Sequence, residues 1–423
     1  MSGSYDLNWL ISVDDHVLEP GHLWQERVPA ALREQAPRLV TDELGEAWIY
    51  EGRRVPTAGL SAAAGRRREE FSFEPITYAE MRPGCYDARK RLVDMDRAGI
   101  LASMCFPSFP RFCGQVFYEA ADKDLALHCV TAYNDWMVEE WCGAAPGRFI
   151  PLIILPLWDP ALAAAEVRRC AGLGVRAVAF SENPEPLGLP TINDPSRYWD
   201  PVWDACQETE TVVCMHIGSS SVPLRLNSNS YQIVNMAWGV GARISGTLLE
   251  WLISPVLDRF PRMRFALSEG GIGWIPYFLE RAEQVIDKQR HWAARGEQRY
   301  DSRTATVEID ESRALDLAGF DIRQRFRDHA YGCFIDDFVG LQHVRDLGIE
   351  NIMIETDYPH SDSTWPHCIT HAHKQLATTD LTDEEKYLIL RGNAERAFGF
   401  TPAEPPAPAE PAAPAGAAPP GAG

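Results

Sequence analysis

The chain has 423 residues, of which 45% are hydrophobic and 24% charged, and its formal net charge is −20. This composition is typical of a folded globular protein, and such an acidic chain is not expected to bind nucleic acid or an anionic membrane surface. Its length allows two or three ordinary domains or one α/β barrel with insertions.

The N-terminal residues lack the basic region and apolar stretch of a signal peptide, and no apolar run is long enough to cross a membrane. The ten cysteines are scattered without a C-x-x-C pair, which indicates reduced thiols rather than a disulfide framework. We therefore expect a cytoplasmic protein.

Eight short apolar runs alternate with helical patterns before residue 400. Several runs are continuously hydrophobic, as buried parallel strands are. This alternation predicts a (β/α)8 barrel, and a doubly wound open sheet is the alternative. No G-x-G-x-x-G or P-loop follows any run, which weakens that alternative. The runs are 10–13, 102–106, 149–155, 177–180, 212–216, 265–269, 331–335 and 352–357.

Three stretches are longer than ordinary connections: 25–85, 217–250 and 284–328. We expect them to be loop insertions over the C-terminal face of a distorted barrel that occupies residues 1–400. Residues 401–423 contain eight Pro and nine Ala and no bulky apolar side chain. This composition predicts a disordered tail.

Side chains that can bind a metal stand at the ends of four of the predicted strands. Asp14 and His16 close the first run, His216 the fifth, Glu269 the sixth and Asp357 the eighth. Barrel active sites are assembled at the C-terminal ends of strands, so these side chains are expected to converge.

The spacing in the first run has a structural meaning. Side chains two positions apart on a strand share a face, so Asp14 and His16 can both point inward while Asp15 points away. Together with His216 and Asp357 they would offer two carboxylates and two imidazoles. This set suits one divalent ion, zinc or manganese, with water or substrate completing its coordination.

The sequence resembles the amidohydrolase superfamily, and within it the group that includes aminocarboxymuconate-semialdehyde and dihydroxybenzoate decarboxylases. The resemblance extends from "ISVDDHVLEP" at residues 11–20 to "RGNAERAFGF" at 391–400. It implies a metal-dependent enzyme that acts on a small molecule, and a homodimer. Matching stretches are "DMDRAGILASMCFPSF" (94–109), "NDPSRYWDPVWDAC" (193–206), "CMHIG" (214–218), "SEGGIGWIPYFLER" (268–281) and "TDYPHSDSTWP" (356–366).

The resemblance also assigns expected roles to individual residues. Asp14 and His16 resemble the carboxylate variant of the first-strand metal motif, which is frequent in the decarboxylases. His216 matches the fifth-strand metal ligand, and Asp357 matches the aspartate that binds or touches the metal and handles the proton.

Glu269 departs from the family pattern, which has a histidine on the sixth strand. This carboxylate could transfer protons, bind the metal or hold a neighbouring side chain. The alternative is a purely structural carboxylate that pairs with Arg281 or a similar cation.

Two reactions fit this set of residues. We expect non-oxidative decarboxylation of a small aromatic or unsaturated carboxylic acid, with Asp357 delivering the proton, because the acidic residue at Asp14 resembles the decarboxylases. Hydrolysis of an amide or lactone by a metal-bound water is the alternative. A barrel that only binds a ligand is a third possibility, against which the intact ligand set argues.

Three further residues are expected to contact the substrate. Phe106 would form a wall of the pocket, Arg111 would bind a carboxylate with two hydrogen bonds, and His360 would border the site. The alternatives are that Phe106 is an ordinary core residue and Arg111 a solvated loop residue.

Overall fold

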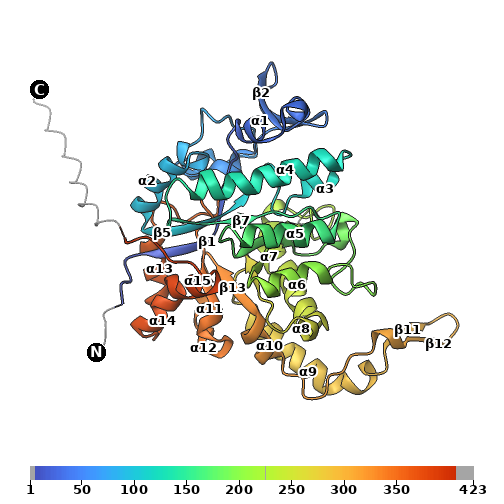
Figure 1. Ribbon diagram of the computed structural model, residues 1–423. Coiled ribbons are helices and arrows are strands. Elements are labelled where there is room, and N and C mark those ends of the chain that lie inside the picture. The colour runs from blue at the N-terminus through green and yellow to red at the C-terminus, as the bar shows by residue number, and fades with distance from the viewer. Residues whose placement is uncertain (1–4, 224, 406–423) are drawn as a thin grey trace, which may run out of the picture.

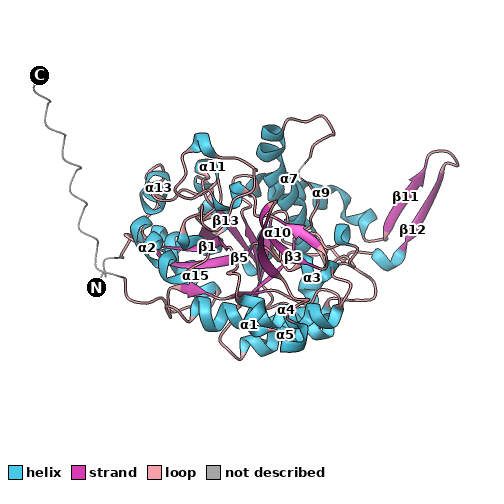
Figure 2. Ribbon diagram, turned by 90° about the horizontal axis from the view of Figure 1, so that it is seen from above, coloured by secondary structure: helices cyan, strands magenta, loops and turns pink. Residues whose placement is uncertain are grey.

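The central strands run parallel in two hydrogen-bonded sheets, and helices surround them (Figure 1, Figure 2). The computed structural model describes residues 5–223 and 225–405. The smaller sheet has the order β1-β5-β6 and the larger one β14-β13-β10-β9-β8-β7. Neighbouring strands follow the chain order without a reversal, as in a barrel and unlike a doubly wound sheet. The strands are β1 Leu10–Val17, β5 Ile100–Pro107, β6 Phe149–Ile150, β7 Leu152–Ile153, β8 Ala177–Ser181, β9 Val212–His216, β10 Phe265–Ser268, β13 Ala330–Phe334 and β14 Ile352–Ile354.

Two junctions connect these sheets into a distorted barrel. β6 and β7 are parts of one segment that is interrupted at Pro151, which has no amide hydrogen to donate. At the other junction, the Asp357 amide donates to the Asp14 carbonyl at 2.9 Å, and the His16 amide donates to the Tyr358 carbonyl at 2.7 Å. These bonds connect β1 to the segment after β14, although no continuous ladder joins the two strands in the described residues.

The eight predicted strands are found, but only the fifth has the predicted bounds, and the differences at the first, third, sixth and eighth affect the candidate site or follow from the backbone. The first continues to Val17, so the predicted ligands of that run lie inside the strand. The third is broken at Pro151. The sixth and eighth end earlier than predicted, because Glu269 and Asp357 adopt φ values of 54° and 52°, which take the chain out of the extended conformation.

The outer helices begin and end at residues that satisfy their terminal backbone groups. Asp87 accepts hydrogen bonds from two amides at the start of α2, and Asp159 does the same for α5. Gly99 ends α2 with a φ of 74°, which glycine adopts without strain. The helices are α1 Leu23–Arg27, α2 Ala88–Ala98, α3 Gln115–Glu119, α4 Lys123–Trp136, α5 Pro160–Ala171, α6 Asp200–Glu208, α7 Gln232–Ile253, α8 Val256–Arg259, α9 Ile275–Ala293, α10 Ile322–His329, α11 Phe338–Leu341, α12 Val344–Leu347, α13 Cys368–Leu376, α14 Asp383–Tyr387 and α15 Asn393–Ala397.

The three long stretches are more ordered than loops. The first contains the antiparallel strands β2 Arg38–Asp42, β3 Gly45–Tyr50 and β4 Arg53–Val55, and most of the second is the helix α7. The third carries the antiparallel strands β11 Glu297–Asp301 and β12 Thr306–Asp310. This hairpin projects away from the barrel rather than covering it (Figure 1).

Residues 401–405 are the described part of the predicted tail, and residues 406–423 lie outside the described residues. The Ala403 amide donates to the Gly147 carbonyl at 2.9 Å, so the first residues of the tail contact the barrel. Among the helices that the structure describes, none is both long and apolar enough to cross a membrane.

Candidate functional site

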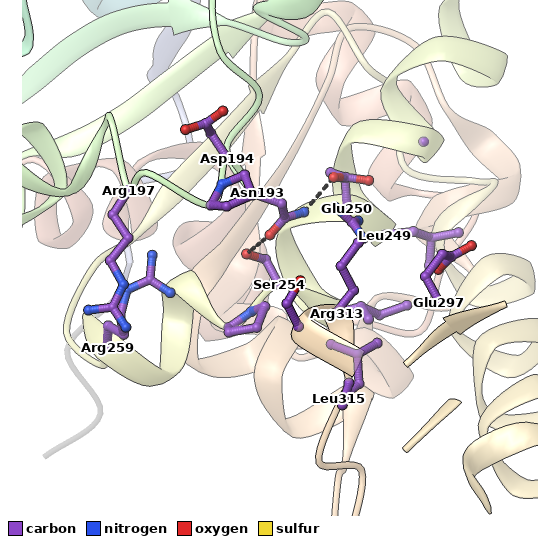
Figure 3. Close-up of a pocket in the computed structure, with 16 residues that line it drawn as sticks. Asn193, Asp194, Arg197, Leu249, Glu250, Ser254, Arg259, Glu297, Arg313 and Leu315 are labelled. Carbon is purple, nitrogen blue, oxygen red and sulfur yellow. Dashed lines mark hydrogen bonds between the residues drawn. The ribbon is translucent and has the colours of Figure 1, made fainter. Parts of the chain in front are cut away.

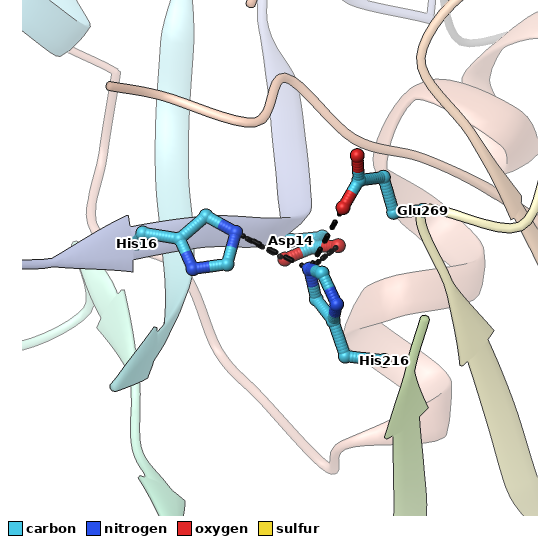
Figure 4. Close-up of side chains that lie close together, drawn as sticks. All are labelled: Asp14, His16, His216 and Glu269. Atoms are coloured by element: carbon cyan, nitrogen blue, oxygen red, sulfur yellow. Dashed lines mark hydrogen bonds and ion pairs between the residues drawn. The ribbon is translucent and has the colours of Figure 1, made fainter. Parts of the chain in front are cut away.

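The candidate metal ligands come from three strands and meet inside the barrel (Figure 4). Asp14 and His16 belong to β1, His216 is the last residue of β9, and Glu269 follows β10. The structure brings one donor atom of each of these four residues within 4.8 Å of the other three. His216 Nε2 is central, because it lies 3.1 Å from Glu269 Oε2, 3.4 Å from Asp14 Oδ2 and 3.3 Å from His16 Nε2.

Asp357 belongs to a second group of potential ligands that shares His16. Its Oδ1 lies 3.2 Å from His16 Nε2 and 2.9 Å from His360 Nδ1. The rings of His16 and His360 stack with their centroids 3.6 Å apart. The sequence predicts that Asp357 completes the metal site with Asp14, His16 and His216. In the structure Glu269 lies beside those three residues, and Asp357 pairs with His360.

The buried side chains of the first group carry an excess of negative charge. Neither oxygen of Asp14 accepts a hydrogen bond from any described group, although the side chain is fully buried. Burial, and after it the charges of Glu355, Asp357 and Glu269, raise the pKa of Asp14 well above its usual range. An unpaired carboxylate in such a place fits a bound cation, which would supply the missing positive charge.

The two imidazoles are suited to bind a metal in their neutral form. Burial, and after it the neighbouring rings of His360 and His216, lower the pKa of His16 well below its usual range. His216 Nδ1 lies 2.6 Å from the carbonyl oxygen of Ile217. A proton on Nδ1 is donated to this oxygen, which leaves the Nε2 lone pair directed at the cluster.

Asp15, the neighbour of Asp14, faces the other side of β1. Its carboxylate accepts hydrogen bonds from the hydroxyl of Ser103, the hydroxyl of Thr356 at 2.6 Å and the amide of Tyr358 at 2.9 Å. The carboxylate of Asp15 therefore has hydrogen-bond donors for its oxygens, as a structural residue does, whereas that of Asp14 has none among the described residues.

The proposed pairing of Glu269 with Arg281 is absent. Arg281 donates to Gln284 at 3.5 Å on the exposed face of α9, while Glu269 points toward His216 (Figure 4). The positive φ of Glu269 turns its side chain back over the end of β10 and toward β9.

A cavity of about 300 Å³ adjoins the cluster. Arg111 and His360 line it, whereas Phe106 lies in the core, with its ring centroid 5.0 Å from that of His216. Phe112 lines the cavity instead, and its ring stacks on that of His216 at 4.1 Å. The other lining residues are His16, Ser61, Pro107, Ser108, Gly218 and Ser221.

A second cavity, of about 580 Å³, lies between α7, residues 193–197 and the base of the β11–β12 hairpin (Figure 3). It is larger than the first, but its lining includes none of the predicted site residues. Glu250 and Ser254 instead bind Asn193 across it. Proximity to the paired imidazoles and carboxylates, and not size, identifies the smaller cavity as the candidate active site.

Two further residues near the site were not predicted from the sequence. Glu355 is a buried carboxylate two positions before Asp357, and burial, followed by the charges of Glu269 and Asp357, raises its pKa well above the usual range. The same two-residue spacing that singled out Asp14 and His16 was a signal for it. Phe112 carried no such signal, because its stacking on His216 depends on the course of the loop after β5.

Comparison with known proteins identifies the family of the chain. The sequence pattern of the amidohydrolase family matches residues 21–400. The chain belongs to this amidohydrolase family. It is 24% identical over 331 residues to a gamma-resorcylate decarboxylase from Polaromonas sp., a match that covers 76% of this chain and 90% of the relative.

Solved structures show the same fold at low identity. The 5-carboxyvanillate decarboxylase from Sphingomonas paucimobilis is 19% identical, with a TM-score of 0.59 over 93% of this chain and 99% of that one. The 5-carboxyvanillate decarboxylase from Novosphingobium aromaticivorans, complexed with manganese and 4-hydroxy-3-methoxy-5-nitrobenzoic acid, is 16% identical. Its TM-score is 0.59 over 93% of this chain and 97% of that one. The amidohydrolase fold of these structures is the barrel that the sequence predicts.

Proposed function

We propose that this protein is a metal-dependent, non-oxidative decarboxylase of a small aromatic carboxylic acid. The observation that carries the proposal is the buried, negatively charged cluster of Asp14, His16, His216 and Glu269 beside a cavity of about 300 Å³. Curated relatives that match most of the chain are gamma-resorcylate decarboxylases, which supports this reaction over hydrolysis.

The cluster would hold one divalent cation through Asp14, His16, His216 and Glu269, with Asp357 close enough to touch it. When bound, the cation would supply the positive charge that holds a substrate carboxylate and an adjacent oxygen. Zinc and manganese both accept imidazole and carboxylate ligands. Manganese is favoured, because Glu269 adds an oxygen where the family pattern has an imidazole nitrogen, and because a related decarboxylase structure contains manganese.

The cavity suits a single aromatic ring with an anionic substituent. Phe112 presents a flat apolar surface at the cavity, and Arg111 offers a guanidinium group at its edge. Arg111 donates to Glu119 and, at 3.2 Å, to Ser221, and both bonds come from Nη1. Its Nη2 and Nε groups are therefore available to bind a substrate carboxylate without the loss of either partner.

Asp357 would handle the proton. In decarboxylation, the bond between the ring carbon and the carboxylate carbon breaks, carbon dioxide leaves, and a new carbon–hydrogen bond forms with a proton from Asp357. Burial disfavours the charged ring of His360, but the charge of Asp357 and the hydrogen bond to it outweigh this effect and raise the pKa of His360. The raised pKa favours a protonated ring, and this ring, with Nδ1 2.9 Å from Asp357 Oδ1, would relay a proton to that carboxylate after each turnover.

We further propose that the protein is a cytoplasmic homodimer. Each of the ten cysteines is a free thiol, and nine of them are buried, which suits a reducing compartment. Large apolar side chains at the start of α7 and before it, among them Tyr231, Ile233 and Trp238, are exposed and could be covered by a second copy. Light scattering of the purified protein tests the dimer.

The decisive experiment combines metal analysis with activity screening. Purified protein is stripped with a chelator, reloaded with manganese or zinc, and incubated with hydroxylated benzoic acids while carbon dioxide release is recorded. A parallel panel of amides and lactones is followed by proton release. The proposal fails if the reloaded protein releases no carbon dioxide from any acid, and proton release from the second panel would establish a hydrolase instead.

A further inference from the structure

Glu19 is a buried carboxylate outside the metal cluster. It lies two residues after β1, and none of its surface is exposed. Its Oε1 accepts a hydrogen bond from the Ser108 amide at 3.0 Å, and its Oε2 accepts one from the Phe109 amide at 2.9 Å. Glu19 makes no ion pair with any described residue, so these amides are the main compensation for burying its charge.

The backbone that Glu19 holds begins the loop after β5. The Arg111 amide donates to the Ser108 carbonyl at 3.1 Å, which closes a turn, and Arg111 itself has a φ of 60°. A non-glycine residue in this left-handed conformation is strained and persists only where its surroundings fix it. The turn therefore needs an anchor, and Glu19 supplies one at its first two amides.

This turn places side chains on the candidate active site. Ser108, Arg111 and Phe112 line the 300 Å³ cavity, and the Phe112 ring covers one face of the His216 ring. Phe109 points the other way, into an aromatic cluster with Trp24 and Trp48 at centroid distances of 5.2 and 5.0 Å. A carboxylate on one side and an aromatic cluster on the other thus fix the turn between them.

Glu19 is itself held in place. The Tyr78 hydroxyl donates to the Glu19 carbonyl at 2.6 Å, which connects this segment to the first long insertion. The insertion also contributes Ser61 to the cavity.

We propose that Glu19 is a positioning residue for the substrate pocket. Its two oxygens fix the Ser108–Phe109 backbone and thereby keep Arg111 and Phe112 in the cavity wall. The effect on substrate binding rests on the proposed function, whereas the effect on the backbone does not.

The substitution Glu19→Gln tests this role. Glutamine has one acceptor oxygen, and its amide group would face the other backbone amide as a second donor, so one of the two bonds is lost. We expect hydrogen–deuterium exchange of the segment containing Ser108 and Phe109 to become about tenfold faster, as the loss of about 1–2 kcal/mol of local stability implies. With a substrate from the decarboxylase panel, KM should rise about tenfold while kcat falls less than threefold, because the proton-handling group is untouched.

Asp159→Asn is the matched control. Asp159 also receives two backbone amides, those of Ala161 and Leu162, but it does so at the start of the outer helix α5 and on a single oxygen. Asparagine keeps that acceptor, so exchange around residue 108 and both kinetic constants should stay at the wild-type values.

The outcomes separate the two proposals. Unchanged exchange at Ser108 and Phe109 in a folded E19Q protein, or faster exchange with an unchanged KM, overturns the positioning role. If the wild type has no decarboxylase activity, the proposed function fails and the exchange measurement alone decides whether Glu19 holds the turn. If E19Q does not fold, Glu19→Asp, which keeps the charge but is too short to reach both amides, is measured in the same way and must show the same local increase.

Discussion

Two adjacent carboxylates of β1, Asp14 and Asp15, are expected to respond to neutralisation in opposite ways. Both are fully buried, but Asp14 accepts no hydrogen bond from the described residues while Asp15 is bound by Ser103, Thr356 and Tyr358. Asp14→Asn therefore removes an uncompensated buried charge, and Asp15→Asn weakens a satisfied network.

The magnitudes follow from these environments. In metal-free protein, D14N should increase the free energy of unfolding by about 1–4 kcal/mol, the range seen when buried ion pairs are replaced by uncharged groups. D15N should decrease it by about 1–3 kcal/mol, because a hydrogen-bonding partner of a buried donor is lost. Manganese at one hundred times its dissociation constant should stabilise the wild type by about 2.7 kcal/mol. D14N should lose most of this gain, and D15N should keep it.

Urea denaturation followed by tryptophan fluorescence measures all three proteins, each with chelator and with manganese chloride. The expected pattern is that D14N is the most stable protein without metal and gains the least from metal. A metal-free D14N that is less stable than the wild type, or one that binds manganese equally well, would refute the assignment of Asp14 as a ligand in a charge-deficient site.

Three further predictions concern the reaction and the loop. Asp357→Asn should reduce turnover about 10²–10⁴-fold with the metal content unchanged, and a variant of normal activity would exclude Asp357 as the proton donor. Arg111→Gln should raise KM about tenfold or more for a carboxylate substrate, and an unchanged KM would remove it from the pocket. Burial raises the pKa of Glu19 to about 7, so the Ser108 amide should exchange faster, after correction for the intrinsic rate, as the pH falls below 7. Opening of the loop alone removes the amide bonds that lower this pKa, so protonation favours local opening. Global unfolding has the opposite sign: the folded state binds the proton more tightly than the unfolded chain, so the contribution of Glu19 to stability decreases as the pH rises from about 4.5 to 7. Both effects should be absent in E19Q.

Much of the fold could be predicted because the barrel strands are buried on both sides. Such strands are continuously apolar, so the polar residues at their ends can be recognised directly in the sequence. The bounds could not be predicted where the backbone conformation decides them, as at Pro151 and at the left-handed Glu269 and Asp357. At these positions the backbone conformation, and not the hydrophobic pattern, decides which residue is the last of the strand.

The candidate site could be predicted only to the level of which strands contribute to it. The spacing of Asp14 and His16 indicated a shared face, and the structure places them on it. The separation of Glu269 and Asp357 into different groups could not be foreseen, because it depends on where two left-handed residues direct their side chains. The contribution of the loop after β5 could not be predicted either, because Phe112 contacts His216 only through the turn that Glu19 holds.

The segment "DDHVLE" shows why residue type alone could not assign these roles. It contains three carboxylates, Asp14, Asp15 and Glu19, within six positions, and all three are fully buried. Asp14 lies among other carboxylates and imidazoles. Asp15 accepts hydrogen bonds from hydroxyl and amide groups, and Glu19 accepts them from two backbone amides. A buried carboxylate is stable as an anion only if donors or a cation compensate its charge. Of the three, only Asp14 lacks donors, and this is the physical reason to expect the cation at Asp14 rather than at either of the other two.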